Sequence, residues 1–393
     1  MRADDSVVRT FEGLPRVLRR SRGYAPLPID LGSEMPEVLA CGAGLKNTFC
    51  LTKGRYALLS QHIGDLENYE TLEFFRETLD RMKKLFRVSP RVAAHDLHPN
   101  YLSTRFALEL EGVETVGVQH HRAHVAACMA ENALYEKVIG VAFDGTGYGT
   151  DGQIWGGEFL IADRDRFERR ACFRYVPLAG GDQAIREPWR AALSYLIETF
   201  GAERPWLGLP LGRQIPRKKL DFVESMIRQR VNTVQTSSCG RLFDAVASLV
   251  GLRHEVTYEG QAAIELEMIA REGVDEFYSF GIEDGNEWHV DVRPAIREIV
   301  HDVRNNIAPA LISAKFHNTI AAVIAGICGR LRQAENLNQV CLSGGTFQNL
   351  YLLTHSLAAQ RSCGFEVFMH SRVPANDGGI SLGQAVVASR RIR

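Results

Sequence analysis

The sequence lacks closely spaced cysteine pairs. Its eight cysteines are scattered, and no two of them stand at the C-x-x-C spacing typical of zinc ribbons and redox motifs. Isolated cysteines among apolar residues are typical of reduced core positions, so we expect no disulfide framework and no zinc ribbon, and we expect a cytoplasmic location. The first residues include Asp4 and Asp5 and no apolar run, so we expect no signal peptide.

An excess of charge of one sign is also missing. The 46 Lys and Arg residues nearly balance the 47 Asp and Glu residues, which leaves a net charge of −1. We therefore expect neither nucleic acid nor a membrane as a partner. No stretch of about 20 apolar residues is present, so no membrane span is predicted. The length of 393 residues suggests two or three folded units.

The first part of the chain predicts an entry segment and one α/β lobe. Residues 1–28 are polar and rich in arginine, which indicates a linker or the remnant of a missing upstream domain, with a solvated surface strap as the alternative. Residues 29–136 form the predicted lobe I, which the C-terminal helix 376–393 completes. Within it we expect short strands and one amphipathic helix with apolar residues every three or four positions: strands 38–41, 48–51, 56–59, 92–94 and 116–118, and helix 69–86.

Residues 137–375 form the predicted lobe II. A strand over 138–143 runs into a glycine-rich turn at 145–149, and a second strand follows at 158–161. We further expect a mostly helical middle at 182–251, a long amphipathic helix at 312–331, strands at 340–342 and 365–369, and a helix at 380–388. Two α/β lobes with glycine turns favour a nucleotide held in a cleft, although many large α/β enzymes show such patterns.

Two histidines and two aspartates are candidate metal ligands. His120 and His124 stand four residues apart in a helix-forming stretch, so their imidazoles share one helix face, whereas His121 points about 100° away. Such a pair can take neighbouring positions on one metal ion; a surface histidine cluster is the alternative. Asp144 ends an apolar strand and Asp377 precedes a helix, where either can bind a metal or a Mg²⁺–phosphate group, or simply cap a turn.

Other polar residues and glycines are candidates for nucleotide binding. Gly145 and Gly147 follow Asp144, and glycine lets backbone amides approach a phosphate. Asp244 is out of phase with the apolar face of its helix and can meet a ribose hydroxyl. Glu259 and Gly260 open another helix, whose N-terminus favours an anion. Simple helix capping explains the last three positions equally well.

Several motifs occur together in one order and resemble a known family. They are SQHIGDLEN (60–68), HDLHP (95–99), QHHRAH (119–124), FDGTGYG (143–149), WGGE (155–158), SCGRLFD (238–244), YEGQAA (258–263), LSGGTFQN (342–349) and NDGG (376–379). Nearly the whole chain resembles the C-terminal part of the HypF family, the carbamoyltransferases of nickel–iron hydrogenase maturation. That region is similar to TsaD, so the resemblance implies a two-lobed actin-like (ASKHA, ribonuclease-H-like) α/β fold.

The resemblance also implies a reaction and a site. His120, His124, Asp144 and Asp377 match the family's metal ligands, for one iron or zinc ion. Gly344, Gly345 and Asn349 match a nucleotide-binding loop, and Asp244, Glu259 and Gly260 fall where related proteins contact the nucleoside. The implied reaction moves a carbamoyl group from carbamoyl-adenylate, made from ATP with Mg²⁺ possible, to the C-terminal cysteine of HypE. The sequence indicates no general base and does not distinguish iron from zinc.

The chain departs from the full family because it lacks the upstream domains, including the TsaC-like adenylating domain. The resemblance therefore implies an excised domain or a split protein that retains the transfer step, with the adenylating domain supplied upstream or in trans. Two other functions remain open. One is an O-carbamoyltransferase that acts on a small-molecule hydroxyl. The other is a nucleotide-gated actin-like binding module without transfer chemistry.

Overall fold

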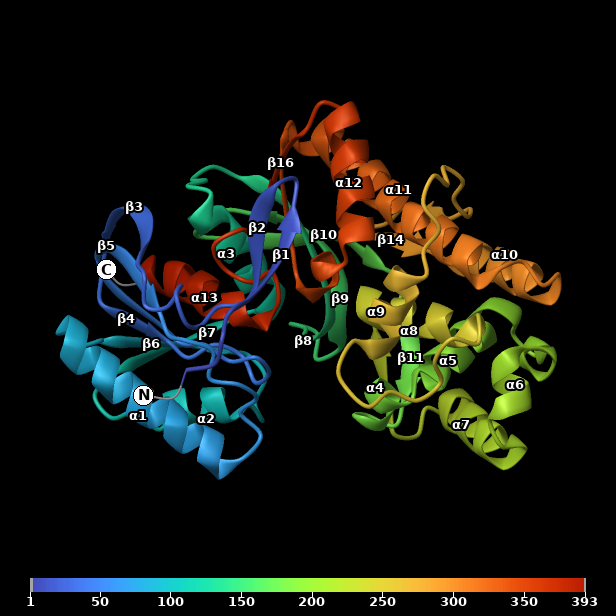
Figure 1. The fold of residues 1–393 in the computed structure, drawn as a ribbon, viewed down its shortest axis with the longest axis horizontal. Helices are drawn as coiled ribbons and strands as arrows, with labels where there is room; N and C mark the ends of the chain where they lie inside the picture. Colours follow the sequence, from blue (N-terminus) through green and yellow to red (C-terminus); the bar gives the residue numbers. More distant parts are fainter. Residues whose placement is uncertain (1–2, 392–393) are drawn as a thin grey trace.

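The computed structural model describes residues 3–391, in which two α/β lobes lie side by side and share the helix α3 (Figure 1). Lobe I contains a five-stranded sheet, and helices cover both of its faces. In sheet order its strands are β3 (Ile29–Met35), β5 (Cys50–Leu59), β4 (Val38–Ala40), β6 (Val92–Asp96) and β7 (Glu114–Val118). Helices α1 (Tyr69–Phe86) and α2 (Leu102–Leu108) cover one face, and α3 (His120–Glu131) and α13 (Ile380–Ser389) cover the other.

Lobe II contains a nine-stranded sheet with α3 on one face and a larger helical layer on the other. Its main path runs β13 (Gly281–Glu283), β14 (Trp288–Asp291), β10 (Phe167–Phe173), β9 (Ile154–Ala162), β8 (Val138–Tyr148), β15 (Gln339–Ser343) and β16 (Glu366–Met369). Strand β12 (Thr233–Thr236) joins β9 and also pairs with β11 (Val176–Ala179). The helical layer is built mainly from α5 (Pro188–Phe200), α8 (Cys239–Leu249), α11 (Pro309–Glu335) and α12 (Leu350–Ser362).

Shorter elements complete lobe II and its loops. They are α4 (Gln183–Arg186), η1 (Pro205–Gly208), α6 (Pro210–Gln214), α7 (Arg217–Gln229), α9 (Gln261–Met268), α10 (Arg293–Arg304), η2 (Gly345–Gln348) and η3 (Asp377–Gly379). Among the described residues, α11 alone is long and apolar enough to cross a membrane by length and composition. Most of it is buried, since 72% of its most apolar window lies inside the protein. It therefore packs here as a core helix of lobe II.

Helix α3 lies between the two sheets, and all twelve of its residues are buried. A helix that is enclosed on every side needs no amphipathic pattern. Small residues let its neighbours come close: a Cβ atom on Gly383 of α13 would lie 1.9 Å from the carbonyl oxygen of Ala123. Likewise, a Cβ atom on Gly140 of β8 would lie 2.5 Å from a methyl of Val125. The backbone of α13 thus meets the backbone of α3, and the backbone of β8 meets a side chain of α3.

The entry segment, which the sequence left open as a linker, a domain remnant or a surface strap, forms two strands. Strands β1 (Val7–Phe11) and β2 (Leu14–Arg19) form an antiparallel hairpin that lies against lobe II. Phe11 joins the core of lobe II, and the buried Arg16 donates from Nε to the carbonyl oxygen of His370 at 3.0 Å. The sequence did not predict these strands, because they bury few side chains and the contacts that order them come from residues far away in the sequence.

Two predicted turns are instead parts of continuous strands. The expected strands 48–51 and 56–59 are one strand, β5, which passes through Gly54 with a φ of +56° and a shift of register against β3. Strand β8 likewise runs through the glycines after Asp144 to Tyr148, with an irregularity between Phe143 and Gly147. A glycine inside a strand marks a bulge as readily as a turn, so the sequence pattern did not separate the two.

Candidate active site

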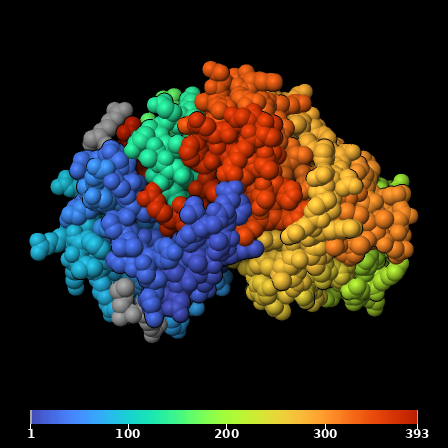
Figure 2. All heavy atoms as spheres, turned by 45° about the horizontal axis from the view of Figure 1, so that its top comes forward, coloured from blue at the N-terminus to red at the C-terminus, as the bar shows by residue number. Residues whose placement is uncertain are grey.

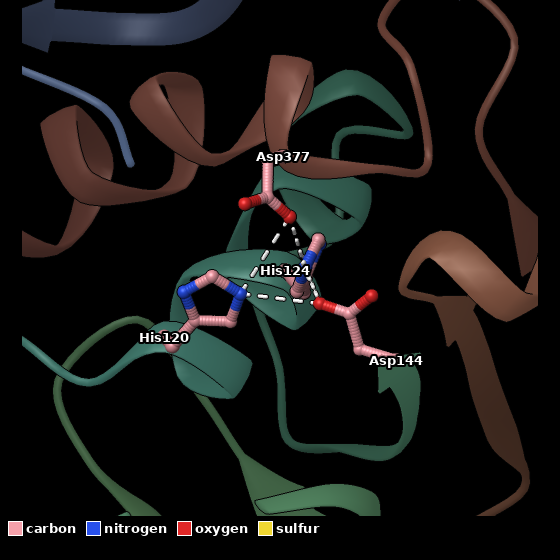
Figure 3. Close-up of side chains that lie close together, drawn as sticks. All are labelled: His120, His124, Asp144 and Asp377. Atoms are coloured by element: carbon pink, nitrogen blue, oxygen red, sulfur yellow. Dashed lines mark hydrogen bonds and ion pairs between the residues drawn. The ribbon is translucent and has the colours of Figure 1, made fainter. Parts of the chain in front are cut away.

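Four side chains converge where α3 meets both lobes (Figure 3). His120 and His124 come from α3, Asp144 from β8, and Asp377 from the turn η3 before α13. One ligand atom from each lies within 4.8 Å of all the others. The Nε2 atoms of both histidines lie 3.2 Å from Asp144 Oδ2, and 3.7 and 3.8 Å from Asp377 Oδ1. The structure therefore brings together all four residues that the sequence proposed as ligands.

The carboxylate of Asp144 is held so that one oxygen faces the histidines. Its Oδ1 accepts hydrogen bonds from the backbone amides of Gly145 at 2.8 Å and Gly345 at 3.3 Å. Its Oδ2 is left to face the imidazoles of His120 and His124. A Cβ atom on Gly345 would lie 2.8 Å from Asp144 Oδ1, so glycine is required for this approach.

Asp96 orients His120 from the side away from the other three ligands. Its Oδ2 lies 2.8 Å from His120 Nδ1, and its Oδ1 accepts the backbone N–H of His98 at 2.9 Å. Asp96 is fully buried. A carboxylate behind a ligating imidazole fixes the tautomer and makes the opposite nitrogen a better electron donor. The sequence analysis missed Asp96, because only the pairing of β6 with β7 and the start of α3 bring it to His120.

A second chain of contacts supports His124. Ser343 Oγ, at the end of β15, donates to the carbonyl oxygen of His124 at 2.9 Å and lies 2.7 Å from His370 Nε2. His370 Nδ1 in turn lies 2.5 Å from a carboxylate oxygen of Glu131, at the end of α3. All four residues are buried. The helix that carries the two imidazoles is thereby tied to the strand that leads into Gly344 and Gly345.

The four side chains shift one another's pKa values, because they are buried together and carry opposite charges. Burial and the charge of Asp144 raise the pKa of Asp377 to about 7, although His120 and Lys46 favour its ionised form. Burial also tends to raise the pKa of Asp144, but hydrogen bonds from the two imidazoles hold it well below its usual range. Burial disfavours the charged form of His120, yet Asp96 and Asp377 raise its pKa well above the usual value. A bound dication can replace these protons, because metal ligands must be deprotonated.

The donor set suits a transition metal. Two imidazole nitrogens and two carboxylate oxygens are ligands typical of both zinc and iron in proteins. The histidines are fully buried, whereas the side chains of Asp144 and Asp377 remain slightly exposed. The four residues would therefore fit one such ion, with the two carboxylates on the side that solvent reaches.

The N-terminus of α8 lies directly against the loop after Asp144. Its cap residue Ser238 donates from Oγ to the carbonyl oxygens of Asp144 at 2.8 Å and Gly145 at 2.6 Å. Asp244, one turn further along, is buried and paired with Arg241 at 2.9 Å. Burial raises the pKa of Asp244 to about 6, and the charge of Glu259 adds to that effect. A helix N-terminus beside a metal-ligand cluster favours a bound anion.

The glycines predicted to bind nucleotide lie close to the four-residue cluster, and each makes a different close contact within the protein. A Cβ atom on Gly147 would lie 2.5 Å from the ring of His121, so this glycine lets β8 cross closely over α3. Gly344 has a φ of +99°, and a Cβ atom there would lie 2.1 Å from the carbonyl oxygen of Phe143. Asn349 has both polar side-chain atoms engaged inside the protein: Oδ1 caps α12 through the N–H of Leu352, and Nδ2 lies 2.8 Å from His317 Nε2.

Glu259 and Lys46 connect the two lobes across the cleft. Lys46 lies in the loop between β4 and β5, and its ammonium forms an ion pair with Glu259, the residue before Gly260 and α9. Asp377 and Asp144 also contribute to the charge environment that raises the pKa of Lys46 against the effect of burial. The surface is hollowed where the blue N-terminal part of the chain meets the yellow part, as Figure 2 shows. Lys46 was not among the predicted site residues, because nothing in its local sequence indicates a partner 213 positions away.

Two protein-family models match this chain, and together they cover parts of both lobes. Residues 33–131 match the family model described as the HypF Kae1-like domain. Residues 140–384 match the model described as a carbamoyltransferase, Kae1-like domain, second subdomain. The chain belongs to the HypF carbamoyltransferase family. Its structure has the two α/β lobes that the sequence predicted.

The similarity to HypF proteins extends over the whole chain. It is 41% identical to carbamoyltransferase HypF of Rhizobium leguminosarum bv. viciae, across 100% of this chain and 50% of that protein. The chain thus spans about half the length of that relative. It is 35% identical to a HypF homolog of Cupriavidus necator, across 92% of this chain and 93% of that protein. A crystal structure of full-length HypF in a phosphate- and nucleotide-bound form superposes with a TM-score of 0.95 and 46% identity, over 99% of this chain and 51% of that chain.

Proposed function

We propose that this chain transfers a carbamoyl group from carbamoyl-adenylate to the C-terminal cysteine of a HypE-type acceptor during assembly of the cyanide ligands of nickel–iron hydrogenase. The observation that carries the proposal is the convergence of His120, His124, Asp144 and Asp377 between the lobes, within a chain of the HypF family. We place the transfer step here and assign activation of carbamoyl phosphate by ATP to a separate TsaC-like domain, in a cytoplasmic setting.

The transfer joins sulfur to carbon and releases AMP. The acceptor thiolate attacks the carbamoyl carbon, the bond from that carbon to the phosphate oxygen breaks, and AMP leaves with the electron pair while the thiol proton passes to solvent. An iron or zinc ion held by the four ligands would supply Lewis acidity toward the oxygens that gain charge.

The chain's own residues position and shield the substrate. Asp144 is oriented by two backbone amides, so its second carboxylate oxygen already faces the histidines before the site fills. The N-terminus of α8 and the ammonium of Lys46 offer positive charge to an adenylate phosphate. The enclosure of the histidine pair between the lobes keeps water away from a mixed anhydride that water would hydrolyse.

The test supplies the two halves of the reaction separately. The chain is mixed with ATP, carbamoyl phosphate and an acceptor ending in cysteine, with and without an added adenylating domain, and mass spectrometry detects the carbamoylated cysteine. We expect modification only when the adenylating domain is present. Asp377→Asn should abolish the modification, whereas the control Asp163→Asn should retain it. Full activity without the domain would show that this chain activates carbamoyl phosphate itself.

Parallel reactions separate the alternative functions. Carbamoylation of an aminoglycoside-like hydroxyl but not of the cysteine would establish an O-carbamoyltransferase. Nucleotide binding that needs only Mg²⁺, with no transfer to either acceptor, would establish a binding module. An acceptor whose C-terminal cysteine is changed to serine is the matched negative control for the thiol reaction.

A further inference from the structure

A second group of possible metal ligands lies on the lobe II sheet, away from the first. Cys172 on β10 is paired in register with His289 on β14, and registered neighbours on adjacent strands point to the same face. Glu287 lies in the bend that leads into β14, directly before Trp288. One ligand atom each from Cys172, Glu287 and His289 lies within 4.8 Å of the others. A thiol and an imidazole from two paired strands therefore lie beside a carboxylate from the adjoining bend.

The ligand atoms of this group are largely uncommitted. Within residues 3–391, no hydrogen bond engages the thiol of Cys172 or the imidazole of His289. Cys172 is fully buried, whereas Glu287 and His289 lie at the surface with intermediate exposure. Glu287 accepts from Arg169 at 2.9 Å through Oε2, which leaves its other oxygen free. A carboxylate ligand is commonly oriented by such a second hydrogen bond.

The charge around the group favours a cation. Arg169 forms ion pairs with Glu287, Glu158 and Asp151, so one guanidinium faces three carboxylates, among which burial raises the pKa of Glu158. Glu158 is itself paired in register with Cys172 from the neighbouring strand β9. A divalent ion here would be attracted by the carboxylates and would displace the thiol proton, since a metal binds the thiolate.

We propose that Cys172, Glu287 and His289 form a second metal site, separate from the four-residue centre, for a zinc-class divalent cation. Thiolate, imidazole and carboxylate are zinc ligands, and three of them leave a fourth position for water. The bound ion joins β10 to the β13–β14 hairpin at the edge of the sheet. Through Glu287 it also fixes Arg169, whose partner Glu158 accepts from Ser237 beside the N-terminus of α8.

Cobalt(II) provides a test that distinguishes the two sites. The four-residue centre contains no sulfur, so an ultraviolet cobalt–thiolate charge-transfer band reports only on a site with cysteine. Cys363 is the one exposed cysteine in the described part of the chain, so all measurements use a Cys363→Ser background. We expect two equivalents of cobalt together with the thiolate band, and zinc-dependent thermal stabilisation.

Variants assign each signal to its site. His289→Gln should lose one equivalent and the band, and Cys172→Ser should do the same, whereas the surface control His301→Gln should lose neither. His120→Ala/His124→Ala should lose the other equivalent and keep the band. Absence of the band in the Cys363→Ser background, or a band unchanged in His289→Gln, would overturn the proposal. If Cys172→Ser does not fold, the partly exposed His289 decides the outcome.

Discussion

At the scale of single residues, the two carboxylates beside the histidine pair are held in opposite states. Asp144 is stabilised as an anion by two imidazoles and two backbone amides, whereas Asp377 has its pKa raised to about 7. Two carboxylates that share one small buried space do not both ionise easily without a cation. The centre is therefore arranged to exchange protons for a metal ion rather than to remain a salt bridge.

Asp96 gives a prediction for metal affinity. Asp96→Asn keeps the shape of the side chain but removes the charge behind His120 Nδ1, so the imidazole becomes a poorer ligand. We expect metal affinity to fall by roughly 10–100-fold, measured by competition with a chelator on the folded protein. The control Asp163→Asn, at the partly exposed turn after β9, should leave affinity unchanged. Equal affinities in Asp96→Asn and wild type would show that Asp96 has only a structural role.

Asp244 gives a prediction for stability against pH. Its pKa in the folded protein is raised to about 6 by burial, so the folded state holds the proton more tightly than the unfolded chain, whose value is about 3.9. The stabilisation is fully present below about pH 4 and is lost as the pH rises through about 6, by roughly 3 kcal/mol at most. Asp244→Asn does not titrate, so urea unfolding of both proteins should show their stability difference changing over this range. A difference that does not depend on pH would contradict the assignment.

The sequence predicted the four ligands but not what holds them. Four-residue helical spacing places His120 and His124 on one face, and strand and turn ends made Asp144 and Asp377 candidates. The resemblance to the HypF family joined the four into one site. Asp96, Lys46 and His370 act through neighbours that only the assembled sheets supply. No pattern within a few residues of these three contains that information.

At the scale of elements, the contact between α3 and α13 gives a prediction with a matched control. Gly383→Ala adds a methyl 1.9 Å from the carbonyl oxygen of Ala123, so we expect a loss of about 2–3 kcal/mol or more. Gly329→Ala, in the interior of α11, meets nothing within 4 Å and should stabilise the protein by up to about 1 kcal/mol. Denaturant unfolding measures both, and a neutral Gly383→Ala would show that the two helices can move apart.

Helices were predicted better than strands for a physical reason. The spacing of apolar residues predicted α1 over Tyr69–Phe86, because the buried face of a helix is visible in its own sequence. The extent of a strand depends on the strands that pair with it: β5 continues through Gly54 because β3 and β4 pair with it on both sides. The β1–β2 hairpin was missed for the same reason, since its order depends on lobe II and not on its own composition.

At the scale of the whole molecule, the lobes are joined by α3 and by the ion pair between Lys46 and Glu259. The two side chains are 32% and 48% exposed, so the pair contributes less than about 1 kcal/mol to global stability. The ion pair instead limits how far the two lobes move relative to each other. The ligands come from both lobes, so closure and metal binding must favour each other.

Lys46→Met gives the corresponding prediction. We expect little change in unfolding free energy but faster hydrogen exchange in the loops around residues 42–47 and 257–260, and the same in Glu259→Gln with no further increase in the double variant. Arg55→Met, which removes a similarly exposed ion pair inside lobe I, should leave exchange at the cleft unchanged. Additive effects of the two single changes would mean that the residues do not act as a pair.

The N-terminal hairpin has a consequence for dissecting the protein into fragments. Asn376, next to the candidate ligand Asp377, donates from Nδ2 to the carbonyl oxygen of Leu18 in β2 at 3.1 Å. Phe11 fills part of the lobe II core from the other strand. A fragment trimmed to begin at the first strand of lobe I, where composition alone places the boundary, would open that core and remove a support of the candidate metal site. Any expression boundary or fusion junction therefore belongs before Val7, so that β1 and β2 keep these contacts.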